Sequence, residues 1–165
     1  MEKIMEGGDI QRKFFACAVN MGTESSPDFQ TVGYKIESSA LELNPDIETI
    51  TDIHGDTYTT LNKFELSQTF EPHRLHTGNE LGEKLIELFR ANNLAAFSQF
   101  QCILIYGFLG TPGNYPADLY DECSIIPSSL GGDAYAEMPF TVNFGGAVTN
   151  GTADRLKGQA LFTPD

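Results

Sequence analysis

The chain has 165 residues, a length suited to one domain with its own hydrophobic core. It carries 23 acidic residues against 10 lysines and arginines, which gives a formal net charge of −13 at pH 7. Residues 36–62 and 91–154 contain no Lys or Arg at all. Because proteins that grip a nucleic-acid backbone need clustered cations, this composition argues against nucleic-acid binding.

The sequence shows no sign of a membrane segment or of a secretory leader. No apolar run approaches the roughly 20 residues that cross a bilayer. The first residues have neither a basic start nor an apolar stretch. We therefore expect a protein made in a cytoplasm, with no membrane partner.

The first half of the chain predicts an irregular N-terminal arm followed by strands. Residues 1–27 are weakly patterned and predict the arm, whereas residues 28–165 predict a single β domain. Residues 28–43 predict a strand pair or one long bulged strand, and residues 47–53 predict a second strand after an Asn-Pro-Asp turn. A third strand, rich in Thr and aromatics, is expected over residues 57–70. Together these segments predict an antiparallel meander.

One helix is expected over residues 79–92. Thr77 and Glu80 have the spacing of a capping box, in which both side chains bind free backbone amides at a helix start. Apolar residues then recur at i, i+4, i+7 and i+8, which predicts a helix face packed on a sheet. The residues of this face are Leu81, Leu85, Leu88 and Phe89.

The second half of the chain predicts further strands. Residues 100–108 are apolar on both faces, as in a central buried strand, and residues 110–118 form a Pro- and Gly-rich loop. A short strand is expected over 122–126, an alternating one over 134–144, and one or two closing strands over 148–162 around the Asn150-Gly151 turn signal. The fold class predicted is mainly β: an antiparallel sandwich or barrel with one flanking helix.

Searches for catalytic or metal-binding patterns give no positive result. His73 with His76, and the Asp52-Ile53-His54-Gly55-Asp56 stretch, lack the three or four converging ligands that a metal site needs. No phosphate-binding glycine loop or Gly-x-Ser-x-Gly elbow is present. The three cysteines are widely spaced and are expected to be reduced and structural. We therefore expect no enzyme activity, no catalytic residues and no cofactor.

Two stretches resemble a known family. They are residues 35–56, KIESSALELNPDIETITDIHGD, and residues 62–72, NKFELSQTFEP. An acidic strand, a "TDI-x-G" turn and a "SQ-x-F-x-P" strand end occur there in the order typical of siphovirus-type bacteriophage major tail proteins, the subunits of the tail tube. The strand at residues 98–108 and the Gly131-Gly132 pair are also similar to that family, and the likeness runs through most of residues 30–152.

This resemblance implies a structural protein of the virion tail, made in the cytoplasm of a host bacterium. It implies a β-sandwich flanked by a helix, with six copies closing into rings that stack into a hollow tube. DNA would pass through the lumen at ejection without specific binding. The other expected partners are the tape-measure protein, the tail terminator and the baseplate or tail-tip proteins.

The base-free meander suggests a source for an acidic lumen. A surface that must not hold DNA should be negatively charged, and six copies of net charge −13 would carry −78. A solvated outer face is the competing explanation for the same acids. The residues predicted to line the lumen are Glu37, Glu42, Glu48 and Asp52.

Contacts between stacked rings are expected from three places: the N-terminal arm, one turn and the C-terminal segment. The residues predicted for the turn and the C-terminal segment are His54, Gly55, Asp56, Leu161 and Phe162.

Two alternatives from other classes stay open. The first is a small-ligand-binding or hydrolytic β-barrel with the histidines and the acidic cluster at Asp118, Asp121 and Glu122 at its mouth. The second is another tail or neck component: a tail terminator, a head-to-tail joining protein, or the tube of a contractile secretion machine.

Overall fold

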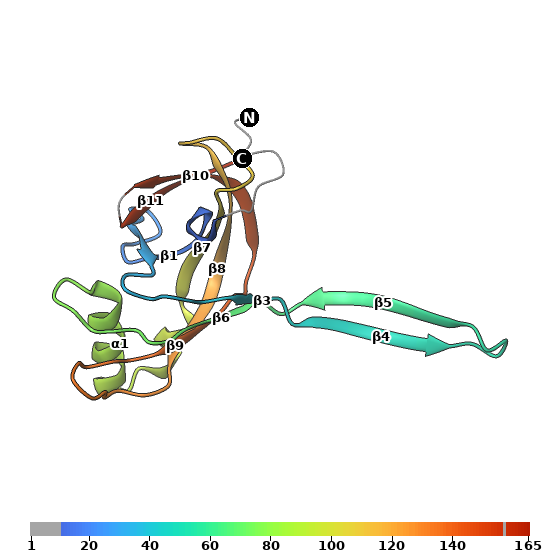
Figure 1. Cartoon of the computed structure of the whole chain (residues 1–165), viewed down its shortest axis with the longest axis horizontal. Helices are drawn as coiled ribbons and strands as arrows, with labels where there is room; N and C mark the ends of the chain where they lie inside the picture. Colours follow the sequence, from blue (N-terminus) through green and yellow to red (C-terminus); the bar gives the residue numbers. More distant parts are fainter. Residues whose placement is uncertain (1–10, 157) are drawn as a thin grey trace.

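The computed structural model describes residues 11–156 and 158–165 of the chain. This part contains the α-helix α1 (Glu80–Arg90), two short 3-10 helices, η1 (Arg12–Phe14) and η2 (Leu94–Ser98), and two antiparallel sheets (Figure 1). The larger sheet is built from β1 (Phe15–Asn20), β2 (Phe29–Val32), β3 (Leu41–Glu42), β6 (Ser67–Phe70), β7 (Phe100–Tyr106), β8 (Tyr115–Pro127), β9 (Phe140–Asn143), β10 (Val148–Leu156) and β11 (Gln159–Pro164). The predicted fold class, mainly β with a flanking helix, is confirmed.

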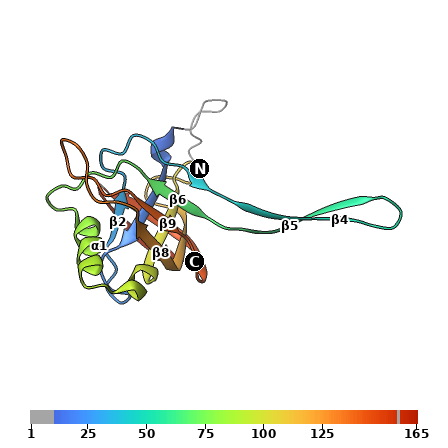
Figure 2. The ribbon, with the colours of Figure 1, turned by 90° about the horizontal axis from the view of Figure 1, so that it is seen from below.

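The large sheet closes on itself through the long strand β8. The strand order is β10-β11-β2-β1-β7-β8-β9-β6-β3, and β10 pairs with β8 as well as with β11. Six strands therefore form a barrel. The second half of β8 leaves the barrel and pairs with β9, which carries β6 and β3 beside it. The second sheet, β4 (Pro45–Thr51) and β5 (Thr57–Phe64), is a hairpin that projects away from the domain (Figures 1 and 2).

The inside of the barrel is filled by small side chains and a few large ones. All six barrel strands contribute side chains to this cluster. Strands β1, β8, β10 and β11 contribute alanines, β2 contributes a phenylalanine, and β7 contributes two isoleucines. Narrow barrels fill their interior in this way, with small residues where the strands crowd. The interior is therefore a packed core. Its buried members are Ala16, Ala18, Phe29, Ile103, Ile105, Ala117, Ala153 and Ala160.

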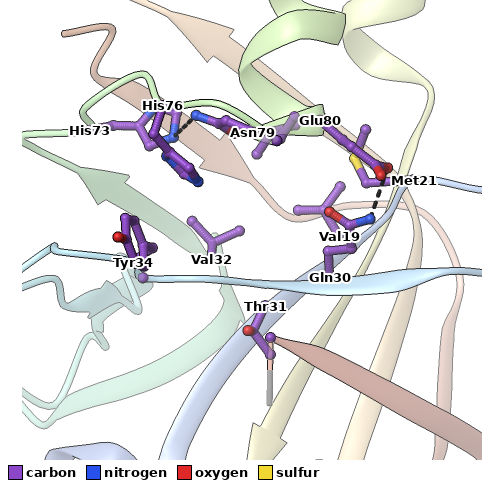
Figure 3. Close-up of a pocket in the computed structure, with 14 residues that line it drawn as sticks. Val19, Met21, Gln30, Thr31, Val32, Tyr34, His73, His76, Asn79 and Glu80 are labelled. Atoms are coloured by element: carbon purple, nitrogen blue, oxygen red, sulfur yellow. Dashed lines mark hydrogen bonds between the residues drawn. The ribbon is translucent and has the colours of Figure 1, made fainter. Parts of the chain in front are cut away.

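The start of α1 is tied to the sheet through two side chains. The Asn79 side-chain oxygen accepts a hydrogen bond from the backbone N–H of Gly82 at 3.1 Å, so Asn79 is the N-cap. Its amide nitrogen lies 3.1 Å from Nε2 of the buried His73, whose Nδ1 lies 3.0 Å from the carbonyl of Met138 (Figure 3). Since a carbonyl only accepts and an amide NH2 only donates, the His73 proton sits on Nδ1. The imidazole is neutral in this arrangement.

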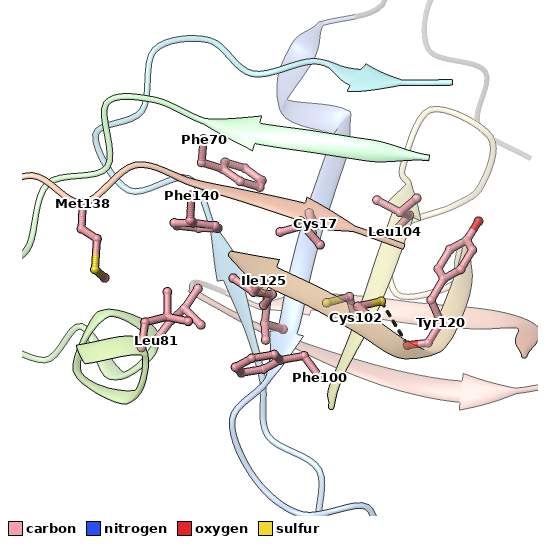
Figure 4. Close-up of a cluster of buried hydrophobic side chains, with 14 residues drawn as sticks. Cys17, Phe70, Leu81, Phe100, Cys102, Leu104, Tyr120, Ile125, Met138 and Phe140 are labelled. Atoms are coloured by element: carbon pink, nitrogen blue, oxygen red, sulfur yellow. Dashed lines mark hydrogen bonds between the residues drawn. The ribbon is translucent and has the colours of Figure 1, made fainter. Parts of the chain in front are cut away.

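A second core lies between the barrel wall, α1 and the strands β6 and β9 (Figure 4). Leu81 and Leu85 of α1 face Phe70 and Phe140, whose ring centroids are 5.2 Å apart. The cysteines are free thiols within this core, and burial raises the pKa of Cys17 far above its usual value. Such thiols behave as small hydrophobes. The three buried cysteines are Cys17, Cys102 and Cys123.

The predicted boundary between an arm and the domain at residue 27 is wrong for the described residues. Phe15–Asn20 is strand β1, which lies between β2 and β7 at the centre of the sheet and is buried over its last five residues. Its short, small-residue run (FACAVN) has no clear alternation because both of its faces are covered. The part of the predicted arm over residues 1–10 lies outside the described residues.

Two predictions about α1 need correction. The helix spans Glu80–Arg90, and its cap is Asn79 in place of the Thr77–Glu80 capping box. Leu81 and Leu85 are buried and Leu88 is half-buried, as a core face requires, but Phe89 is 68% exposed. Phe89 lies at the edge of the apolar stripe, and most of its side chain stays outside the core.

Other strand boundaries also differ from the prediction. The expected strand over 57–70 is divided into β5 and β6, because the chain leaves the hairpin and then enters the large sheet. β8 begins at Tyr115, inside the expected loop, and β9 is limited to Phe140–Asn143. Asn150 and Gly151 lie within β10 in place of a turn; the chain reverses between β10 and β11 near Gly158, whose φ is 75°.

Leu85 and Phe89 provide a matched pair for testing the core. Leu85→Ala removes a fully buried side chain and should lower the free energy of unfolding by about 2–5 kcal/mol. Phe89→Ala, one turn further along the same helix, should change it by no more than about 0.5 kcal/mol. Urea unfolding of both variants measures this; similar losses in the two would contradict the packing of α1.

The His73–Asn79 link predicts a pH dependence of stability. Burial lowers the pKa of His73 below its ordinary value, while in the unfolded chain it returns to about 6.5. Below that pH the unfolded state binds more protons than the folded one, so stability should fall as the pH drops from about 7 to about 5. His73→Gln should flatten this part of the profile, measured by urea unfolding at several pH values. His54→Gln, on an exposed turn, is the control and should leave the profile unchanged.

Candidate functional site

The β4–β5 hairpin is the surface of the domain that has no partner within the described chain. Every residue of both strands is exposed, and neither core cluster contains any of them. A two-stranded hairpin is marginally stable by itself in water. Large apolar side chains on such a ribbon mark an interaction surface. Exposed apolar residues lie along its length: Ile47, Ile50, Ile53, Tyr58, Leu61 and Phe64.

The register divides the hairpin into two unlike faces. Residues directly opposite each other in an antiparallel pair share a face, and successive residues alternate between faces. Ile47 lies opposite Leu61, and Ile50 lies opposite Tyr58, with a bulge near Asp46. One face therefore carries no charged residue; it consists of Pro45, Ile47, Thr49, Thr51, Thr57, Thr59, Leu61 and Phe64. We call this the uncharged face.

The opposite face, here called the charged face, carries all the charged residues of the two strands together with two exposed apolar side chains; it consists of Asp46, Glu48, Ile50, Tyr58, Thr60 and Lys63. The Lys63 Nζ atom lies 3.0 Å from a carboxylate oxygen of Glu65, an exposed pair of the kind that contributes little to stability. The ribbon thus has one apolar and threonine-rich face without charges, and one face on which Asp46, Glu48 and Lys63 flank the apolar Ile50–Tyr58 pair.

The turn at the end of the hairpin is held in one conformation by its first residue. The Asp52 carboxylate accepts hydrogen bonds from the backbone N–H groups of His54, at 2.8 Å, and Asp56, at 3.0 Å. Asp52 and Asp56 are also joined by a backbone hydrogen bond of 2.9 Å, and Gly55 has a φ of 84°, which favours glycine. Ile53 stands at the tip with 99% of its surface exposed.

The four acids predicted to line a lumen lie on separate segments. Glu48 is on the charged face of the hairpin and Asp52 begins the tip turn. Glu42 is exposed on β3, at the end of the large sheet, and Glu37 is exposed in the connection between β2 and β3. Asp46, which was not among the four, shares a face with Glu48. Strand alternation through residues 46–50 is the signal that could have found it.

The residues predicted for ring stacking also differ in their settings. His54, Gly55 and Asp56 form the exposed end of the hairpin. Leu161 is exposed on β11, but Phe162 packs toward the barrel core, with its ring centroid 6.5 Å from that of Phe29. Of the two C-terminal residues, only Leu161 has its side chain available to a partner.

His73 and His76 line a cavity. This cavity, of about 240 Å³, lies between β2 and the start of α1, with His73, His76 and Asn79 on one side and Tyr34 on the other (Figure 3). Both ring nitrogens of His73 are occupied, and the His76 ring lies against Tyr34 with centroids 4.6 Å apart. Within the described residues, no group of three or more His, Cys, Asp or Glu side chains could hold a metal ion.

None of the helices in the described ranges combines the length and apolarity that a bilayer crossing needs.

Sequence comparisons identify no relative. No family model matches the chain, and no curated protein does.

Solved structures, in contrast, share its fold. A chain from an extracellular contractile injection system, described as the PVC sheath/tube terminator in the extended state, is 14% identical, with a TM-score of 0.53 over 87% of this chain and 96% of its own length. The anti-feeding prophage cap, described as the AFP tube terminating cap, is 17% identical, with a TM-score of 0.53 over 92% and 97%. A chain from the PVC sheath-tube complex is 15% identical, with a TM-score of 0.52 over 88% and 93%. At these identities the likeness shows the fold, which this chain shares over nearly the full length of each neighbour.

Proposed function

We propose that the chain is a structural subunit of a phage-like tail tube and that it assembles with copies of itself into rings. The observation that carries this proposal is the hairpin: a ribbon outside the core that exposes an uncharged face along its whole length. The fold shared with chains of tube and terminator assemblies supports the same reading. In this proposal the uncharged face packs against a neighbouring copy, which supplies the apolar cover that the domain itself does not.

The finer proposal is a ring of six copies around a channel for DNA. Such a ring would carry a formal charge of −78, which opposes binding of a nucleic-acid backbone. Asp46 and Glu48, on the charged face of the hairpin, are the acids best arranged to line a channel when the opposite face is covered. Glu37, Glu42 and Asp52 are proposed to add to this charge. Tape-measure, terminator and tail-tip proteins are the proposed partners.

A tube terminator is the second candidate function. It is favoured by the descriptions of two of the structural neighbours, a sheath/tube terminator and a tube terminating cap, whose chains are matched over 96% and 97% of their lengths. A terminator and a tube subunit would both form rings. They differ in that a tube subunit stacks ring on ring, whereas a terminator forms a single ring that ends a tube.

Electron microscopy of the purified protein over a range of concentrations, together with analytical ultracentrifugation, tests the assembly. A tube subunit should give hollow rings of sixfold symmetry that lengthen into tubes as concentration rises. A terminator should give rings of one height at every concentration. A protein that stays monomeric up to millimolar concentration, alone and with preformed tubes, would contradict both candidates.

A pair of double variants tests which face of the hairpin joins the copies. Ile47→Ser with Leu61→Ser should abolish assembly while leaving the free energy of unfolding unchanged within about 0.5 kcal/mol, because neither side chain belongs to a core. Asp46→Asn with Glu48→Gln is the control on the other face; it removes charge repulsion and should leave assembly intact. Ultracentrifugation and urea unfolding measure the two effects. Equal loss of assembly in both pairs would refute the two-face assignment.

A further inference from the structure

The tip of the hairpin, residues 52–56, is a protruding turn with a fixed conformation, and we call it the knob. Its turn is held by the Asp52 carboxylate, so binding there would cost little ordering entropy. Ile53 is almost fully exposed and stands between the acidic residues Asp52 and Asp56. A complementary site would therefore combine an apolar hollow with positive charge at its rim. Such a site should be rare on a chain with 23 acids and 10 bases.

The described surface contains a cavity of this kind. It measures about 240 Å³ and is lined by Phe14, Ile105, Gly107 and Tyr115, with Lys13 and Arg155 as its charged residues. This volume is below the roughly 300–1,000 Å³ usual for small-molecule sites and suits a protruding side chain better than a cofactor. No carboxylate is among the lining residues that the structure describes. We call this cavity the basic pocket.

The basic pocket is built on rigid parts of the domain. The backbone N–H of Gly107 donates to the carbonyl of Phe14 at 2.6 Å, which fixes η1 at the end of β7. The Arg155 guanidinium donates to the carbonyl of Lys13, which joins β10 to η1. Lys13 itself lies over the Phe14 ring, with Nζ 5.4 Å from the ring centroid. Two cations from distant parts of the sequence are therefore held at one opening.

The knob lies far from the pocket of its own chain. It stands at the free end of the hairpin, which projects from the domain (Figures 1 and 2), whereas the pocket is lined by residues of the domain itself. A contact between knob and pocket on two copies joins unlike surfaces, and head-to-tail contacts of this type generate closed rings or open stacks.

We propose that the basic pocket receives the hairpin tip of a second copy of this chain, with Ile53 in the hollow and Asp52 and Asp56 near Lys13 and Arg155. The inference rests on the proposed self-assembly and names the acceptor site for the hairpin. Subunits of net charge −13 repel one another, so a local pairing of opposite charges fixes the orientation in which they meet. The charged groups facing the contact are Asp52, His54 and Asp56 from the tip and Lys13 and Arg155 from the pocket.

Photo-crosslinking of the full-length chain maps the acceptor directly. With p-benzoylphenylalanine at position 53, ultraviolet irradiation at concentrations that give rings or tubes should yield intermolecular cross-links, located by mass spectrometry in residues 13–14, 105–107, 115 or 155. Cross-links to another apolar hollow of the described surface, formed by Ile86, Phe89, Leu130 and neighbouring residues, would overturn the proposal.

A charge swap provides the second arm. Lys13→Glu and Asp56→Lys should each raise the concentration needed for half-maximal assembly about tenfold. The combined variant should restore assembly to near the level of the unmodified chain. Arg90→Glu makes the same change in charge at an exposed position, the last residue of α1. It is the matched control and should have little effect on assembly. Circular dichroism verifies that each variant is folded.

The outcomes separate this inference from the proposed function. Assembly of the unmodified chain, with cross-links elsewhere or without rescue by the double charge swap, overturns the basic pocket as the acceptor and leaves the self-assembling subunit standing. Absence of both assembly and cross-links at every concentration overturns the two together. Cross-links at the basic pocket, together with rescue of assembly by the combined charge-swap variant, would support both the proposed self-assembly and the basic pocket as the acceptor.

Discussion

Strands β1 and β7 hold the molecule together because each one contributes side chains to two cores at once. In β1, Ala16 and Ala18 face the barrel interior, while Cys17 and Val19 face the core beneath α1; in β7, Ile103 and Ile105 face inward and Cys102 and Leu104 outward. The barrel and the helix-covered layer therefore share a wall. A strand buried on both faces tolerates few changes in volume, since closely packed interiors resist both cavities and overpacking.

The β4–β5 hairpin, in contrast to β1 and β7, is exposed on both faces. Its two strands leave the large sheet between β3 and β6 and contribute nothing to either core, so its sequence is free of the packing constraints on the domain. The ribbon has an uncharged face and a face that carries Asp46, Glu48 and Lys63. An exposed ribbon with open edges invites association with other chains, and proteins keep such an edge only where the association is used or is blocked. The proposed self-assembly would use it.

Charge gives the proposed assembly its direction. Subunits of high negative charge stay apart unless apolar burial or local pairing outweighs the repulsion. The uncharged face offers the apolar area. The acidic tip and the basic pocket offer a pairing between two unlike surfaces, which suits a head-to-tail contact more than a symmetric dimer. Within the domain, the His73–Asn79 link fixes the start of α1, and with it the helix that covers the second core.

Local periodicity and composition were enough to predict the β-rich class, a helix over residues 79–92, a buried strand over 100–108 and an acidic chain, and the structure places α1 at Glu80–Arg90 and β7 at Phe100–Tyr106. It did not reveal β1, since a strand covered on both faces has no alternation to detect. It also could not show that Ile47 and Leu61 are exposed while Ala16 and Ala18 are buried: strand alternation tells which residues share a face, but not what covers that face. The three-dimensional packing is needed to distinguish these positions, because burial depends on contacts between residues far apart in the chain. The same reason applies to the basic pocket, where Lys13 and Arg155 meet across almost the full length of the sequence.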